Sequence, residues 1–196
     1  MSSPGLRISG PKPDAYVLGE PLDVFDGDLH LGRLNSIQVG AGGGTLHLDD
    51  FRTTDLKRLQ TWRTARLIVV EILSYLVDRH PSVSAFDISL SADVEALDGT
   101  EGGARRLAQA RMQMLHSVGT TEIRMVPKPH PRHSAHFVVR GVWYYNADNA
   151  QALAHALNEE RQGFAQRKID AAQAEPVTAP PPSMIARLLA KERHKP

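Results

Sequence analysis

The 196-residue sequence contains no cysteine, which excludes disulfide bonds, thiolate metal sites and a cysteine nucleophile. Long hydrophobic runs are also missing. The longest uninterrupted run, Leu67–Val70, lies between Arg66 and Glu71, so no membrane-spanning segment is expected. Neither sign of charge is in excess, because 23 Lys and Arg offset 22 Asp and Glu and leave a net charge of +1. This balance argues against a nucleic-acid-binding protein held by bulk charge.

The residues that are present indicate a single globular domain. Hydrophobic residues make up 41% of the chain and charged residues 23%, as in ordinary folded proteins. The first residues, MSSPGLRISGPKPD, lack the apolar segment of a signal peptide, so a cytoplasmic location is expected. Their Ser, Pro and Gly content predicts a disordered lead over residues 1–14 and leaves export by a dedicated bacterial secretion system open.

Alternating apolar and polar residues predict strands in the first part of the domain. The segments YVLGEPLDVF and LHLGRL, separated by Asp26-Gly27-Asp28, are expected to form a hairpin. Two more strands are expected over residues 36–39 and 45–48, joined by the glycine-rich loop GAGGG. Because a strand rather than a helix follows this loop, a hairpin turn is favoured over a phosphate-binding loop.

Apolar residues at helical spacing predict three helices later in the chain. They are expected over residues 56–79, 104–118 and 146–172, and Gly119 is suited to end the second. The residue before Pro81 resists the helical conformation, which places the end of the first helix near residue 79.

Further strands are expected over residues 83–90, 122–126 and 136–145, and the basic loop PKPHPRHS precedes the last of them. Together the elements predict an α+β domain over residues 15–172, with a mixed, mainly antiparallel sheet packed with two to three helices. The predicted core joins one helix to the strands through Ile68, Ile72, Leu76, Phe86, Ile88, Val139 and Trp143.

The end of the chain is expected to stand apart from this domain. Residues 173–182 contain the proline-rich stretch EPVTAPPP and predict an extended linker. The short segment 183–196 is basic, and its apolar residues fall on one helical face: Met184, Ile185, Leu188 and Leu189. This face either folds back onto the domain or docks in a groove of a protein partner, and the tether slightly favours docking.

Three histidines close in sequence, His130, His133 and His136, raise the question of a metal site. Pro129 and Pro131 exclude a helix that would gather them on one side. On a strand, His133 and His136 would point to opposite faces. No metal is therefore expected. The sequence also lacks the G-x-S-x-G motif of a serine nucleophile.

From Ser36 to Tyr145 the order of elements resembles the second half of the GCN5-related N-acetyltransferase fold. The strand TLHL precedes the long helix, AQARMQMLHSVG is similar to that family's A-x-x-L-Y-x-x-x-G-F segment, and HFVVRGVWYY looks like its final strand. The resemblance implies an acetyltransferase-like architecture of two to three layers, with acetyl-CoA as the family's cofactor.

The sequence departs from this family where the cofactor would bind and react. In the family, a glycine-rich loop at the start of the long helix binds the pyrophosphate through free N–H groups. The corresponding stretch here, RTTDLKR at residues 52–58, has no glycine and includes Asp55. The family tyrosine that protonates the leaving thiolate corresponds to Leu115. His116 is adjacent but rotated by about 100° around the helix.

Two functions remain open, and the departures favour the first. It is a non-catalytic or degenerate acetyltransferase-like domain that needs no cofactor and acts by binding a protein partner. A bacterial secreted effector is one form of such a protein. The alternative is a divergent N-acyltransferase that uses an acyl-CoA such as acetyl-CoA. Its candidate catalytic residues are His47, Asp49 and His116, and its candidate cofactor-binding residues are Arg52, Thr53, Thr54 and Lys57.

Overall fold

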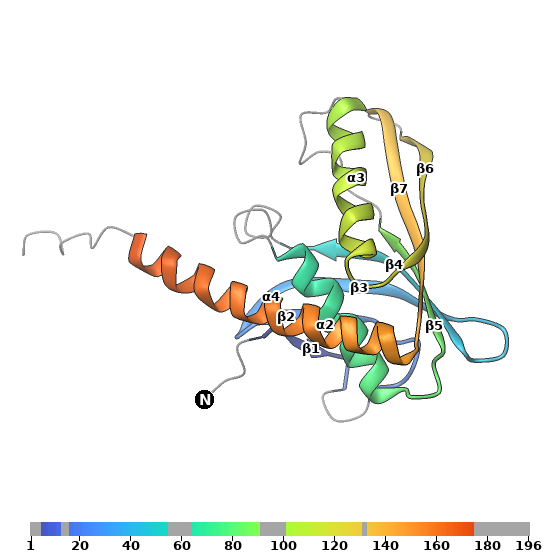
Figure 1. Ribbon diagram of the computed structural model, residues 1–196, viewed down its shortest axis with the longest axis horizontal. Coiled ribbons are helices and arrows are strands. Elements are labelled where there is room, and N and C mark those ends of the chain that lie inside the picture. Colours follow the sequence, from blue (N-terminus) through green and yellow to red (C-terminus); the bar gives the residue numbers. More distant parts are fainter. Residues whose placement is uncertain (1–4, 13–15, 55–63, 91–100, 131–132, 175–196) are drawn as a thin grey trace, which may run out of the picture.

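The computed structural model describes residues 5–12, 16–54, 64–90, 101–130 and 133–174 and confirms an α+β fold with a mixed, mainly antiparallel sheet (Figure 1). Within these residues the chain forms, in order, β1 (Arg7–Ser9), β2 (Leu22–Asp26), β3 (Leu29–Val39), β4 (Thr45–Thr53), α2 (Ala65–Arg79), β5 (Ala85–Leu90), α3 (Glu101–His116), β6 (Thr121–His130), β7 (His133–Tyr144) and α4 (Ala147–Ala174).

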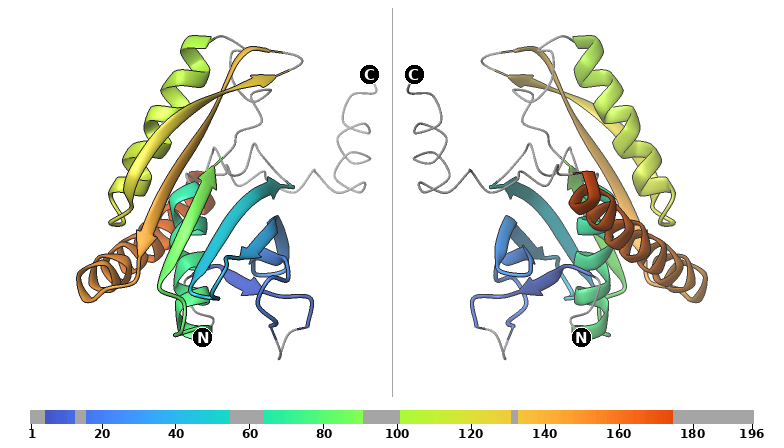
Figure 2. Two further views of the ribbon diagram at one scale, coloured as in Figure 1. Left: turned by 90° about the vertical axis from the view of Figure 1, so that its right-hand side faces the viewer. Right: turned by 90° about the vertical axis from the view of Figure 1, so that its left-hand side faces the viewer.

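All seven strands belong to one sheet with the order β1-β2-β3-β4-β5-β7-β6. Neighbouring strands are antiparallel except β4 and β5, which are parallel because α2 carries the chain back between them. The parallel pairing covers only four positions, from Thr45 opposite Ala85 to Leu48 opposite Ile88. Beyond these positions the two strands diverge toward their C-terminal ends (Figure 2).

The three described helices lie on one face of the sheet (Figure 2). Against them pack buried strand residues, among them Phe86 and Trp143, whose rings are 5.6 Å apart. Trp143 also donates its indole N–H to the carbonyl oxygen of Val118, at 2.8 Å. All seven residues of the predicted core belong to this one buried cluster, which confirms that prediction. The opposite face of the sheet, which no described helix covers, is called the open face below.

The start of the chain corrects a prediction. Residues 1–14 were expected to form a disordered lead, whereas Arg7–Ser9 form β1 and pair with β2. Leu6 is buried, and its N–H donates to the Glu71 carboxylate at 3.2 Å. Arg161 of α4 binds the same carboxylate with two nitrogens, at 2.8 and 2.7 Å. Leu6 and the buried Glu71 of α2 therefore hold β1 in place. The sequence did not indicate this strand, because the residues around it are rich in Gly and Pro.

The predicted loop between the last two strands is also too long. β6 continues through Pro127 to His130, and β7 begins at His133. Pro127 is tolerated because β6 is the outermost strand of the sheet, where a missing N–H leaves the pairing with β7 intact. At the other end, α4 continues to Ala174, past the linker start expected at residue 173.

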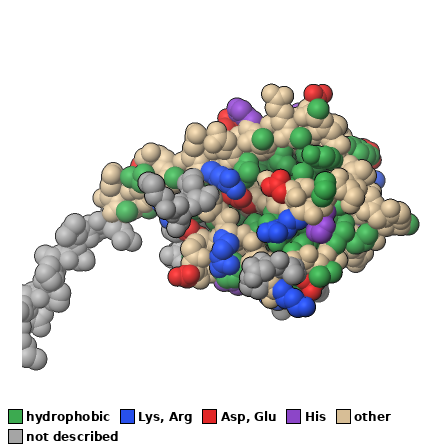
Figure 3. Space-filling model, turned by 90° about the horizontal axis from the view of Figure 1, so that it is seen from below, with side chains coloured by type: hydrophobic (Ala, Val, Ile, Leu, Met, Phe, Trp, Pro, Cys, Tyr) green, Lys and Arg blue, Asp and Glu red, His purple; other side chains and the backbone are tan. Residues whose placement is uncertain are grey.

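Other expectations fall outside the described residues. These are the first part of the long helix over residues 56–63, most of the linker, and the segment 183–196. Within the described part of the chain, no helix is long and apolar enough to cross a membrane. In the space-filling view from below, basic and acidic side chains are close neighbours, with hydrophobic ones between them (Figure 3).

Candidate functional site

The candidate site is the opening where β4 and β5 diverge. β4 runs on to Thr53, but its pairing with β5 stops at Leu48. A strand edge carries backbone N–H and C=O groups that need hydrogen-bond partners. From Asp49 onward, the edge of β4 toward β5 has no strand partner among the described residues. The opening can therefore accept an extended ligand that bears amides.

A local backbone distortion lies at the point where the opening begins. Asp50 has a φ of 58°, in the left-handed region that a non-glycine residue rarely adopts. Its N–H donates to the Asp49 carboxylate at 2.7 Å, and the Asn35 amide donates to its carbonyl oxygen at 3.2 Å. The alternation of β4 shifts here, because Leu48 is buried and the next residue packed against the core is Phe51. Hydrogen bonds from the Asp49 and Asn35 side chains therefore hold the backbone at Asp50, where the regular alternation of the strand is interrupted.

A histidine and an aspartate face each other just below the opening. His47 of β4 is directly opposite Asp87 of β5, and its Nδ1 lies 2.9 Å from the Asp87 carboxylate. Their side chains are 45% and 38% exposed on the open face. When a carboxylate accepts from the Nδ1–H, the other nitrogen, Nε2, is left as a proton acceptor. The pair has the geometry of an oriented general base.

Asp87 was missed as a candidate, although the alternating segment AFDISL predicts that it points away from the core. Its partner could not be identified from the sequence, because that requires the register between β4 and β5. The other two predicted catalytic residues have different surroundings. Asp49 lies on the same face of β4 but its carboxylate holds the backbone of Asp50. His116, at the end of α3, lies beside the first residues of β6, three strands away from β4.

Three of the predicted cofactor-binding residues, Arg52, Thr53 and Thr54, already have side-chain partners within β4 or on β3. Arg52 binds the Asp50 carboxylate at 3.0 Å, and its side chain is 74% exposed. The hydroxyl of Thr53 donates to the carbonyl oxygen of Leu31 at 3.1 Å, and that of Thr54 donates to a carbonyl of the same strand. The two threonine bonds extend the pairing of β3 with β4. Lys57 lies outside the described residues.

The inward face of α3 carries no group that could protonate a leaving thiolate at the predicted place. Leu115 is completely buried in the core. One turn earlier on the same stripe, Arg111 is half-buried and makes no ion pair with a described residue. Burial lowers the pKa of Arg111 to about 10. The helix therefore presents a partly desolvated cation and an apolar side chain.

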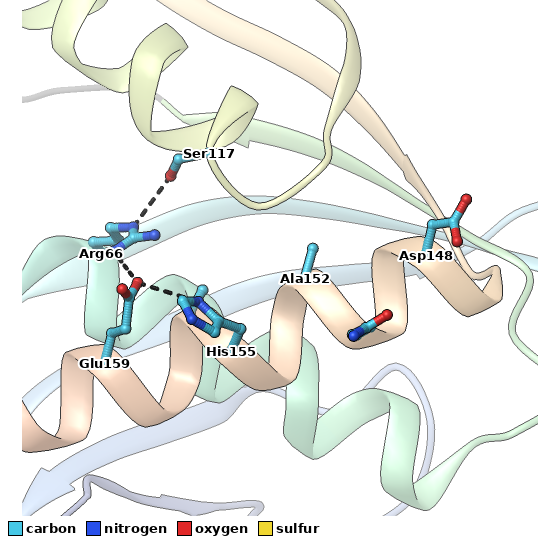
Figure 4. A pocket seen from close by; sticks show the side chains of 8 residues that line it. Arg66, Ser117, Asp148, Ala152, His155 and Glu159 are labelled. Atoms are coloured by element: carbon cyan, nitrogen blue, oxygen red, sulfur yellow. Dashed lines mark hydrogen bonds and ion pairs between the residues drawn. The ribbon is translucent and has the colours of Figure 1, made fainter.

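A shallow hollow of about 400 Å³ lies apart from this opening, between the start of α2, the end of α3 and α4 (Figure 4). Arg66 bridges it, donating to Ser117 Oγ at 3.1 Å and binding the Glu160 carboxylate at 2.9 Å. His155 lies 3.5 Å from Glu159. Arg66 therefore joins α2 to the end of α3 and to α4, an arrangement that suits helix packing better than ligand binding.

No family model and no curated protein matches the sequence. Among solved structures, the chain is similar to mutant forms of the spermidine/spermine N-acetyltransferase SpeG from Vibrio cholerae, with a TM-score of 0.44 and 10% identity, over 69% of this chain and 70% of that one. A Bacillus subtilis acetyltransferase in complex with CoA is also similar, with a TM-score of 0.43 and 10% identity, over 72% of this chain and 99% of that one.

A protein of unknown function from Aquifex aeolicus is also similar, with a TM-score of 0.37 and 11% identity, over 82% of this chain and 78% of that one. The predicted similarity to acetyltransferases is thus found among solved structures. At these TM-scores and identities it carries no conclusion about activity or ligand.

Proposed function

We propose that this chain is an acetyltransferase-like domain that acts by binding a protein partner and does not transfer acyl groups. One observation carries the proposal: four of the side chains expected to bind or activate an acyl-CoA, Asp49, Arg52, Thr53 and Thr54, already have partners within the fold. Asp49 holds the distorted backbone of β4, and the hydroxyls of Thr53 and Thr54 are bonded to β3. Leu115, buried and apolar, occupies the position expected for the acid.

The opening between β4 and β5 suits a peptide as well as a cofactor. The edge of β4 beyond Leu48, which pairs with no described strand on its β5 side, could hydrogen-bond to the main chain of an extended segment, as in strand addition. The segment 183–196 remains a proposed second contact, through Met184, Ile185, Leu188 and Leu189. Partner binding in the cytoplasm or after export is equally compatible with these features.

Calorimetry with acetyl-CoA tests the proposal. Without free hydroxyls or glycines for the phosphates, we expect binding no tighter than about millimolar, near −4 kcal/mol, and expect salt to remove it. An acyltransferase should bind in the micromolar range, near −8 kcal/mol, and keep most of that affinity in moderate salt. Salt-resistant micromolar binding that is lost in Thr54→Glu would contradict the proposal.

The pair His47 and Asp87 favours a second candidate, the divergent N-acyltransferase. His47 Nε2 would accept a proton from the attacking amine while Asp87 stabilises the imidazolium. The new bond joins the amine nitrogen to the acyl carbon and the C–S bond breaks. The thiolate takes a proton from water, because Leu115 has none to give, and the resulting hydroxide is neutralised by the proton that His47 releases.

Release of free thiol from acetyl-CoA, with a lysine-containing peptide as acceptor, distinguishes the two candidates. For the proposed binding protein, the wild type should release thiol no faster than the His47→Gln variant. A rate at least about a hundredfold above that variant, the usual contribution of a general base, would favour the enzyme. Asp87→Asn should then reduce the rate as well, because it leaves the imidazole unoriented.

A further inference from the structure

Two arginines face each other across the last two strands of the sheet. Arg124 of β6 is directly opposite Arg140 of β7, and both side chains are exposed. They lie on the open face, because the next residue pair, Met125 and Val139, packs toward the core. Like charges directly opposite each other destabilise an antiparallel pair. The pairing of Arg124 with Arg140 is therefore expected to lower the stability of the domain.

A second cross-strand arginine shows how the fold neutralises such a charge elsewhere. Arg33 of β3 lies opposite Asp23 of β2 and binds its carboxylate with two nitrogens, at 2.8 and 2.7 Å. This bidentate bond lowers the pKa of Asp23 below its ordinary value. Arg124 and Arg140, by contrast, make no hydrogen bond or ion pair with any residue in the described part of the chain.

Among the described residues around the two arginines, one adds positive charge and the acids already have partners. Lys128 is exposed four residues further along β6 and points to the same face. Two acids occupy neighbouring strand positions, but each already has a partner. Glu122 accepts from the Tyr144 hydroxyl at 2.8 Å, and Asp87 is bonded to His47. The surface formed by Arg124, Lys128 and Arg140 is called the basic surface below.

We infer that the basic surface binds an acidic segment of the partner protein through carboxylates; this rests on the proposed function for the existence of such a partner. The planar fork of a guanidinium matches a carboxylate with two parallel bonds. Two arginines side by side can hold two carboxylates or share one.

The shape of this region favours a polypeptide over a small molecule. Of two hollows in the described part of the chain, one lies between α2, α3 and α4 and the other between α3 and the first residues of β6, and neither includes Arg124 or Arg140. A flat strand surface offers no enclosure for a small anion, whereas an extended segment can lie across it. The chain's own segment 183–196 is unsuited, because four Lys and Arg against one Glu make it repel the basic surface.

Fluorescence anisotropy with a labelled decaglutamate peptide and the full chain tests the inference. The wild type should bind, and the double variant Arg124→Gln/Arg140→Gln should bind about tenfold more weakly, because two charge-assisted contacts are lost. Arg105→Gln is the control for the loss of a single arginine: it removes one positive charge from the exposed side of α3, where Arg105 pairs with Glu101. The control should bind within about twofold of the wild type.

Stability gives an independent readout. Removing one of two opposed like charges should leave the denaturation midpoint of Arg124→Gln unchanged or raise it. A lowered midpoint accompanied by lost binding would assign the arginines a structural role and overturn the inference. Equal binding by the wild type and the double variant, or none by the wild type, would overturn it too.

Two further arms separate other sources of negative charge. Inorganic phosphate at concentrations that keep ionic strength constant should not displace the peptide, and vesicles containing phosphatidylserine should not bind in an arginine-dependent way. Displacement by phosphate, or vesicle binding that the double variant loses, would overturn the peptide assignment. Acyl transfer by the chain would contradict the proposed function while leaving this peptide assay unaffected, so the two failures are distinguishable.

Discussion

The helix-covered face and the open face of the sheet are made by alternate residues of the same strands, yet their environments differ sharply. Phe86 and Trp143 are completely buried, and their next residues along the chain, Asp87 and Tyr144, are partly exposed and hydrogen-bonded. Successive residues of one strand therefore lie in two different environments, because their side chains point to opposite faces of the sheet. The helix-covered face therefore supplies most of the folding stability, and the polar side chains of the open face are available for binding.

The largest expected difference comes from the two adjacent aromatic residues of β7. Trp143→Ala should destabilise the domain by about 3–5 kcal/mol, because it empties the centre of the core and leaves the Val118 carbonyl without its donor. Tyr144→Ala removes a side chain that is 43% exposed and should destabilise it by less than about 1 kcal/mol. Urea denaturation of both variants measures the difference. Similar losses would show that the open face is covered in solution.

Acids on the two faces give a smaller contrast. Glu71→Gln leaves Arg161 without its counterion and weakens the bond that holds β1, so we expect a loss of about 2 kcal/mol. The side chain of Glu71 is only 4% exposed, which limits compensation by water. Asp87→Asn, on the open face, should cost less than about 1 kcal/mol. Denaturation midpoints of the two variants measure both losses. A larger loss for Asp87→Asn than for Glu71→Gln would contradict the prediction.

The pH dependence of stability should reflect His80, at the end of α2. Burial, together with the nearby Arg79 charge, lowers the pKa of His80, and its Nε2 is buried without a hydrogen bond to a described residue. At a pH between the two pKa values, His80 is therefore protonated in the unfolded chain and neutral in the folded chain. Stability is therefore lost as the pH falls below the ordinary histidine value of about 6.5.

The variant His80→Gln should lose part of this dependence, and His47→Gln, on the open face, is the matched control that keeps the contribution of His80. Denaturation midpoints at pH 8 and at pH 5.5 measure the effect. An identical fall in the wild type and in His80→Gln would show that other groups account for it.

The smallest effect is expected at the end of the chain. Deleting residues 175–196 should change the free energy of unfolding by less than about 0.5 kcal/mol, because a segment beyond a proline-rich tether adds little to a core. Partner binding should weaken if the apolar residues of that segment dock. A large loss of melting temperature would mean that the segment packs on the domain.

Regular patterns made most of the fold predictable. The apolar stripe of α2 and the alternation of β5 and β7 identified the core residues, because both periods report directly on burial. The hairpins that surround Gly27 and the loop 40–44 followed from turn residues. β1 was missed because only Leu6 and Ile8 distinguish it from a polar terminus. The extension of β6 was missed because prolines are compatible with a strand only at a sheet edge.

The candidate site was less predictable, because its features depend on contacts between distant segments. His47 and Asp49 were predicted as alternative bases, and the surroundings of each follow from a partner: Asp87 for His47 and the Asp50 backbone for Asp49. Asp87, 40 residues away from His47, became visible only through the parallel register. The distorted backbone at Asp50 has no signature in the sequence, since it depends on Asn35 of the adjacent strand.

The short parallel contact between β4 and β5 also has a consequence for how the chain folds. The strands before it pair as successive hairpins, and β6 and β7 form another, so each group can assemble from neighbouring segments. Joining the groups requires closure of a long crossover for only four residue pairs. Because non-local pairing is slow and short pairing is weak, this contact should be the last to form during refolding. In the native protein it should open first, turning the sheet into two semi-independent halves connected by α2.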